Sequence, residues 1–85
     1  MPAKNFLIPQ KVRKKTYKLP VRIQKHLPEV FITIKQNPIA GIKLKGVLSD
    51  YYKVRIGDYR IIYKFNAKSS IVELVKIEHR QGVYR

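Results

Sequence analysis

Six side chains in the second half of the sequence carry groups that could act together on a phosphodiester. They are Lys53, Arg55, Arg60, His79, Arg80 and Tyr84. When a ribose 2′-hydroxyl attacks the neighbouring phosphate, negative charge builds up on a five-coordinate phosphorus. Fixed guanidinium groups can stabilise that charge through paired hydrogen bonds. This combination of residue types therefore points to chemistry on an RNA backbone.

Such a reaction also needs a base to take the 2′-proton and an acid to protonate the leaving 5′-oxygen. Lys53 is one candidate base, because the positive charges of Arg55 and Arg60 should disfavour its ammonium form. His79 is the other candidate, because an imidazole titrates near neutral pH. Tyr84 could stack on a nucleobase, hold a phosphate oxygen or relay a proton. The sequence leaves the choice between Lys53 and His79 open.

Each of these residues also has a simpler explanation. Arg55 and Arg60 could be solvated edge charges that discourage sheets from aggregating. Taken alone, His79 fits the end of a strand or helix, and Tyr84 fits ordinary packing. The functional interpretation gains weight only if the basic groups and Tyr84 converge on one side of one sheet.

A β-hairpin should bring the central basic groups together. Residues 51–65 contain two runs rich in Tyr, Val and Ile on either side of Gly57-Asp58, which is typical of a two-residue turn. In that register Arg55 faces Arg60, on the sheet face opposite to the apolar side chains. Two like charges in direct opposition destabilise a sheet by about half a kcal/mol. A pair that carries this cost suggests a functional use for the charges.

The remaining elements should complete one small domain over residues 1–85. A short strand is expected over residues 5–8, helices over 10–19 and 21–35, a connector over 37–46 and a strand over 69–77. Pro28 could kink or restart the second helix, whose VFITI segment would also suit a strand. The order predicts an α+β fold, a small antiparallel sheet with two N-terminal helices packed on one face. The opposite face, with Lys53, Arg55 and Arg60, would stay partly open.

The charge balance favours an anionic partner. The 85 residues include 19 Lys and Arg against 5 Asp and Glu, a formal net charge of +14, and eight basic residues precede the first carboxylate, Glu29. Such an excess suits a polyanion or an acidic protein, although a basic run can also be a solvated helix face. A hydrophobic content of 45% indicates a folded chain rather than a disordered basic tail. Further candidates for RNA binding are Lys11, Lys14, Lys15, Lys45 and Lys64.

Several other classes of function find little support. The chain has no Cys, and His26 and His79 fall in separate expected elements, so neither a metal nor a cofactor is expected. The four glycines are scattered and form no phosphate-binding loop. No apolar run is long enough for a signal peptide or for a span of a bilayer. We therefore expect a cytoplasmic protein.

Two long segments, KLKGVLSDYYKVRIGDYRIIYKF and IVELVKIEHRQGVY, resemble the RelE/ParE superfamily of small toxins from bacterial and archaeal toxin–antitoxin pairs. The segments KLPVRIQKHL and NPIAGIKLKG are similar to that family's helical hairpin and connector. The most specific parts are the strand pair with GDYR and the ending HR..VY. The fold implied is RelE-like, which is related to that of microbial ribonucleases.

Proteins of the RelE branch cleave mRNA on the ribosome, without a metal, and so inhibit translation. The resemblance implies functional positions at Lys53, Arg55, Arg60, Arg80 and Tyr84. RelE has a lysine in place of Arg55, which leaves Lys53 as the basic amine of this chain. His79 stands where other branches can use a histidine.

The resemblance also implies partners. The first is an acidic antitoxin similar to RelB, whose extended segment would neutralise the basic surface. Operator DNA would be contacted only by the complex, which would repress its own operon. Two alternatives stay open: a ParE-like inhibitor of DNA gyrase, which typically lacks the cationic set, and a basic module that binds RNA without cleaving it.

Overall fold

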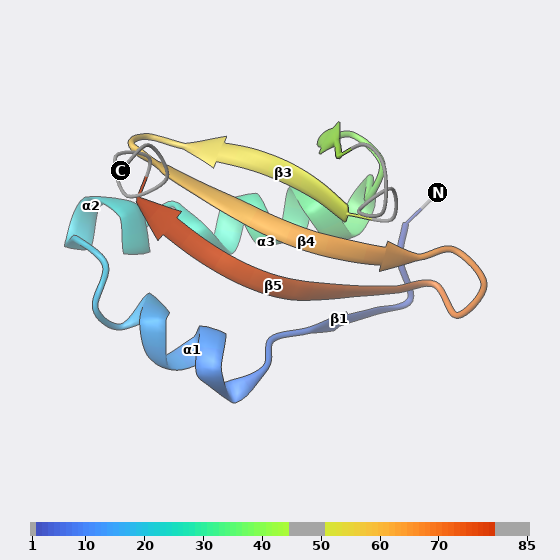
Figure 1. Ribbon diagram of the computed structural model, residues 1–85, viewed down its shortest axis with the longest axis horizontal. Helices are drawn as coiled ribbons and strands as arrows, with labels where there is room; N and C mark the ends of the chain where they lie inside the picture. The colour runs from blue at the N-terminus through green and yellow to red at the C-terminus, as the bar shows by residue number, and fades with distance from the viewer. Residues whose placement is uncertain (1, 45–50, 80–85) are drawn as a thin grey trace.

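The computed structural model describes residues 2–44 and 51–79 and has a five-stranded sheet with helices on one face (Figure 1). Its strands are β1 Asn5–Leu7, β2 Ile42–Lys43, β3 Tyr51–Ile56, β4 Tyr59–Asn66 and β5 Ile71–His79. Its helices are α1 Gln10–Thr16, α2 Val21–Gln24 and α3 Leu27–Gln36. The predicted α+β class is confirmed. None of the described helices combines the length and the apolar character needed to cross a membrane.

The β3–β4 hairpin has the predicted register. Arg55 pairs with Arg60, and Ile56 pairs with Tyr59 at the turn. Gly57 has a φ of +59°, which the first position of a two-residue hairpin turn requires and which glycine adopts without steric cost. The turn chemistry therefore sets the register, and the register sets which side chains share a face.

The sheet is mixed, which corrects the prediction of an antiparallel sheet. The strand order is β1-β5-β4-β3-β2, and β1 runs parallel to β5, whereas the other neighbours are antiparallel. A parallel pair needs a long crossover, and here the chain between β1 and β5 includes all three helices. The predicted connector also contributes an edge strand, because Ile42 pairs with Lys53 and Lys43 with Tyr52.

The helix expected over residues 21–35 is divided in two. α2 ends at Gln24, and α3 begins at Leu27, one residue before Pro28. A proline lacks the N–H for a helical hydrogen bond, and its ring clashes with the carbonyl four residues earlier, which here belongs to Gln24. The first turn of a new helix tolerates proline. The helical layer therefore contains three segments instead of two.

One apolar core lies between the helices and the sheet. Its buried side chains include Val12, Ile23, Leu27 and Ile34 from the helices and Tyr52, Ile61, Tyr63, Val72, Leu74 and Ile77 from the strands. The hydroxyl of Tyr63 donates a hydrogen bond to the Pro38 carbonyl oxygen over 2.7 Å. Burial raises the pKa of Tyr63, so this phenol keeps its proton and remains a donor.

A β-bulge in β5 changes the direction of the side chains that follow it. Ile62 pairs with Lys76 whereas Tyr63 pairs with Leu74, so Val75 has no partner in the ladder. Successive side chains on a strand point to opposite faces. Because of this extra residue, each side chain of β5 after Val75 points to the face opposite to the one that simple alternation from Leu74 would give it. We call this the reversed phase of the strand.

The reversed phase fixes the orientation of the last described residues. Counting by twos from the buried Leu74 would place Glu78 on the core face and His79 on the opposite face. Ile77 is instead buried in the core, and Glu78 pairs with Arg60. The bulge therefore turns Glu78 toward the face without helices and His79 toward the face with them.

The buried hydrogen bond of Tyr63 gives a stability prediction. We expect Tyr63→Phe to lower the free energy of unfolding by about 1–3 kcal/mol, because the buried Pro38 carbonyl loses its donor. Urea titration of both proteins measures the change. Tyr17→Phe is the control, because Tyr17 is exposed and its loss should change stability by less than about 0.5 kcal/mol. Equal effects of the two variants would contradict the assignment.

The same bond predicts a dependence on alkaline pH. The raised pKa of folded Tyr63 means that its contribution is complete below the unfolded value of about 10 and is lost as the pH rises through the folded value. The stability difference between wild type and Tyr63→Phe should therefore narrow above about pH 10. A constant difference across that range would contradict this account.

Candidate nucleic-acid interface

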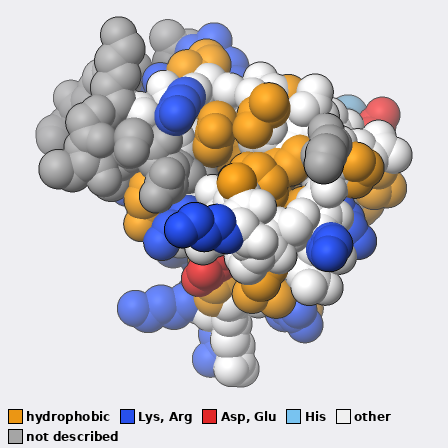
Figure 2. Space-filling model, turned by 90° about the vertical axis from the view of Figure 1, so that its right-hand side faces the viewer, with side chains coloured by type: hydrophobic (Ala, Val, Ile, Leu, Met, Phe, Trp, Pro, Cys, Tyr) orange, Lys and Arg blue, Asp and Glu red, His pale blue; other side chains and the backbone are white. Residues whose placement is uncertain are grey.

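Among the described residues, five basic side chains lie on the sheet face turned away from the helices, and we call it the cationic face. They are Lys53 and Arg55 on β3, Arg60 and Lys64 on β4, and Lys76 on β5. The strand registers and the alternation of side chains place them on this one face. At the end of the molecule shown in Figure 2, Lys and Arg side chains likewise predominate over Asp and Glu.

Two rungs of the ladder, separated by one rung that faces the core, hold the centre of the cationic face. One rung is Arg55–Arg60–Glu78, and the other is Ile42–Lys53–Ile62–Lys76. Directly paired residues have their Cβ atoms about 5 Å apart, and diagonal neighbours are within reach of long side chains. The structure therefore brings Lys53, Arg55 and Arg60 together, as the sequence predicts.

Glu78 offsets part of the positive charge at this centre. It pairs with Arg60 in the ladder, and its Oε2 lies 3.5 Å from the Nζ of Lys76. Glu78 reaches this face only because of the bulge at Val75, so the spacing of residues in the sequence does not single it out. In the sequence, the adjacent apolar residues Leu74 and Val75 interrupt the alternation of the strand, and this interruption is the signal that could have indicated the bulge.

Two hollows lie beside Lys53 and Arg60, and both residues line each of them. The smaller hollow, of about 280 Å³, also includes Arg55 and Ile42. The larger, of about 400 Å³, has Lys76 and Glu78 beside apolar side chains that include Ile62 and Val75. Ligand pockets typically measure about 300–1,000 Å³. The larger hollow thus offers an apolar surface for a base or sugar next to cations for a phosphate.

His79 lies on the other side of the sheet from these cations. It pairs with Tyr59, and the two ring centroids are 4.9 Å apart with the planes at 85°. Tyr59 in turn packs against the core. The structure therefore does not bring His79 together with Lys53, and the bulge at Val75 is the reason.

The other predicted contacts are more dispersed. Lys64 lies on the next rung of the cationic face beyond Lys53, with its Nζ 5.8 Å from the centre of the Tyr51 ring. Exposed on α1, on the helix side of the sheet, are Lys11, Lys14 and Lys15. Outside the described residues are Lys45, Arg80 and Tyr84. Within residues 2–44 and 51–79, no three His, Asp or Glu side chains are grouped to hold a metal ion.

Comparison with known proteins places this geometry in a family. Residues 8–84 match the family of ParE toxins of type II toxin–antitoxin systems, parDE. The chain belongs to the RelE/ParE superfamily of toxins. It is 35% identical to the putative toxin RelE1 of Methanocaldococcus jannaschii, over 95% of this chain and 94% of the relative. It is 29% identical to the toxin RelG of Mycobacterium tuberculosis, over 86% of each chain.

The fold of the toxin is also that of a solved relative. The archaeal RelE–RelB complex from Pyrococcus horikoshii contains a chain that superposes with a TM-score of 0.79, at 29% identity, over 94% of this toxin and 97% of that chain. The mixed sheet with helices on one face is therefore the arrangement of a RelE-like toxin.

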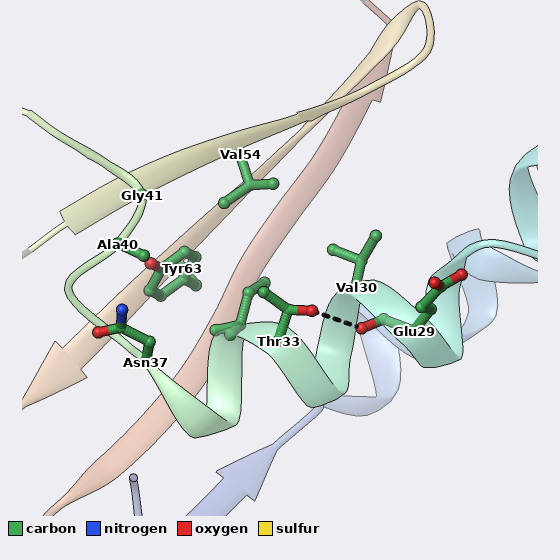
Figure 3. A pocket seen from close by; sticks show the side chains of 9 residues that line it. Glu29, Val30, Thr33, Asn37, Ala40, Gly41, Val54 and Tyr63 are labelled. Carbon is green, nitrogen blue, oxygen red and sulfur yellow. Dashed lines mark hydrogen bonds between the residues drawn. The ribbon is translucent and has the colours of Figure 1, made fainter. Parts of the chain in front are cut away.

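The toxin has a second concave surface on its helix side (Figure 3). A groove of about 360 Å³ lies between α3 and residues 37–41, and Val54 and Tyr63 line it from the sheet. At its α3 wall the Thr33 hydroxyl donates to the Glu29 carbonyl oxygen over 3.0 Å. Of the residues that the structure describes, no Lys or Arg lines this groove. Of the two surfaces, only the cationic face is therefore suited to binding a phosphate.

The Arg55–Arg60 pair predicts that stability and RNA binding oppose each other in this toxin. We expect Arg55→Gln to raise the free energy of unfolding by about half a kcal/mol, because it removes a like-charge pair, and to weaken RNA binding. Urea titration and fluorescence anisotropy with a labelled RNA measure the two effects. Lys68→Gln is the control, because it removes the same charge from the exposed turn between β4 and β5. Stabilisation by Lys68→Gln of the same size would contradict the pairwise explanation.

Proposed function

We propose that this toxin is an endoribonuclease that cleaves mRNA, at the A site of the ribosome, and so inhibits translation. The observation that carries the proposal is the convergence of Lys53, Arg55 and Arg60 on two rungs of one open sheet face. Those groups suit the binding of a scissile phosphate between the two hollows that Lys53 and Arg60 share. The names of the relatives RelE1 and RelG are consistent with this activity.

In the proposed reaction the 2′-oxygen attacks the adjacent phosphorus and the bond to the 5′-oxygen breaks. The products are a 2′,3′-cyclic phosphate and a 5′-hydroxyl. Arg60 is the main stabiliser of the phosphorane charge, because β4 is paired on both sides and the residue is half-buried. Arg55, which is exposed, would bind the phosphate from the hairpin side. Since the cationic groups neutralise the charge themselves, the reaction would need no metal.

The C-terminal residues Arg80 and Tyr84 are part of the same proposal. They follow directly after β5, whose last described residues lie beside β4. We expect Arg80 to add a further guanidinium to the phosphate and Tyr84 to contact a base or a phosphate oxygen. His79 is a weaker candidate, because its ring packs on Tyr59 at the opposite face.

We further propose that an acidic antitoxin similar to RelB binds this toxin and neutralises it. The solved neighbour from Pyrococcus horikoshii is a complex of RelE with RelB. A net charge of +14 and an open cationic face would attract a partner of opposite charge and speed its association. Contact with operator DNA would then come through the antitoxin in the complex.

A second candidate function is inhibition of DNA gyrase. The match to ParE toxins over residues 8–84 favours it, and the paired cations Arg55 and Arg60 count against it because a gyrase inhibitor has no need of a phosphate-cleaving centre. Supercoiling assays with purified gyrase distinguish the two. Inhibition of supercoiling without any cleavage of mRNA would support the second candidate.

The proposed role of Arg60 can be tested directly. We expect Arg60→Ala to lower the rate of mRNA cleavage on stalled ribosomes by about 10²–10³-fold, the usual effect of removing a group that stabilises developing charge. Growth arrest on expression in a bacterial host should be lost as well. Primer extension on translated mRNA measures the cuts.

The matched control is Lys35→Ala, which removes a cation from the last turn of α3 on the helix side of the sheet. It should cleave RNA and arrest growth as the wild type does. Circular dichroism establishes that both variants fold. Full cleavage and full toxicity of Arg60→Ala would refute the proposed site.

A further inference from the structure

Glu78 is a carboxylate placed among the catalytic cations. Of the four carboxylates in the described residues, Glu73 and Glu78 lie on the cationic face, since they pair with Lys64 and Arg60 there. Glu73 lies at the far end of that face, beside β1. Glu78 belongs to the central rung, so it needs an explanation that Glu73 does not.

The surroundings of Glu78 place it where a substrate would bind. It lines the larger hollow together with Lys53 and Arg60. The side chain of Glu78 is 27% exposed to solvent, so it is partly enclosed and still accessible to a substrate. Its Oε2 lies 3.5 Å from the Nζ of Lys76. A carboxylate that lines a hollow in this way can contact a ribose that sits there.

Building on the proposed ribonuclease function, we infer that the Glu78 carboxylate is the general base that accepts the 2′-proton. The assignment gives the two proton transfers to two different groups that line the same hollow, with Glu78 as the base and Lys53 as the acid. The assignment also provides a base on the cationic face, where the described structure places no histidine.

Every bond and proton of the proposed cleavage step is accounted for. The 2′-oxygen transfers its proton to Glu78 and forms a bond to phosphorus, while Arg55 and Arg60 stabilise the charge on the phosphoryl oxygens. The bond between phosphorus and the 5′-oxygen then breaks, and the 5′-oxygen receives a proton from the Lys53 ammonium. No oxidant, reductant or further reactant is needed.

The alternative is that Glu78 only neutralises Arg60 and holds it in position. The two roles differ in their pH dependence. If the Glu78 carboxylate takes the proton, hydroxide takes no part in the step, so the rate should stay flat between about pH 6 and pH 9. If hydroxide or a neutral lysine amine took the proton instead, the rate would rise about tenfold per pH unit over the same interval.

The test is the single-turnover cleavage rate of a ribosome-bound mRNA as a function of pH, for wild type and Glu78→Gln. Glutamine keeps the shape of the side chain but cannot accept the proton. We expect a flat profile for wild type. For Glu78→Gln we expect a loss of about 10²–10⁴-fold and a new slope of one, because hydroxide replaces the missing base.

The control is Glu73→Gln, which removes the other carboxylate of the cationic face and should retain both the wild-type rate and the flat profile. Thermal unfolding establishes that the two variants fold equally well. A Glu78→Gln variant within a few-fold of wild type, or one that is slow but keeps a flat profile, would overturn the inference. A wild-type rate that rises tenfold per pH unit would overturn it too.

The failure of this inference can be told apart from the failure of the proposed function. Wild-type protein that cuts no mRNA, with or without ribosomes, refutes the ribonuclease itself and this role of Glu78 with it. Wild-type protein that cuts mRNA while Glu78→Gln cuts equally well refutes only the role of Glu78.

Discussion

The alternation of side chains along β4 is the constraint on which the rest of the toxin depends. β4 is paired on both sides, so each of its residues has a fixed direction. Ile61 and Tyr63 point into the core under the helices, and Arg60 and Lys64 point the other way. A single strand thus contributes to the core and presents basic side chains on the cationic face, and a slip by one residue would exchange the two sets.

This arrangement concentrates positive charge where the helices do not cover the sheet. Arg55 and Arg60 repel each other across the hairpin, at a cost that is small beside the burial of apolar residues such as Ile61 and Tyr63 on the opposite face. Glu78 on the neighbouring strand offsets part of the repulsion. A bound anion would relieve the cost that remains, so the same charges that destabilise the sheet would favour an anionic partner.

The sequence predicts the local parts of this structure well. The hairpin from Tyr51 to Asn66 follows from the turn at Gly57 and from alternation, and both are encoded in neighbouring residues. The parallel pairing of β1 with β5 depends on residues far apart in the chain, so local patterns do not reveal it. The bulge at Val75 has a similar origin, because it is defined by the ladder to β4. The grouping of Lys53, Arg55 and Arg60 could therefore be predicted from the hairpin, whereas the sides of the sheet on which Glu78 and His79 lie depend on the bulge and could not.

The cations of the proposed centre thus depend on pairing within one hairpin, whereas its carboxylate depends on the pairing of β5 with β4. The hairpin alone would place the cations of β3 and β4 together, since their register is local. Glu78 joins them only when β5 pairs along β4 and the bulge at Val75 turns the strand. A proton acceptor beside Arg60 therefore exists only in the complete sheet. A partly folded chain would carry the cations without the carboxylate, so the proposed reaction would require the finished sheet.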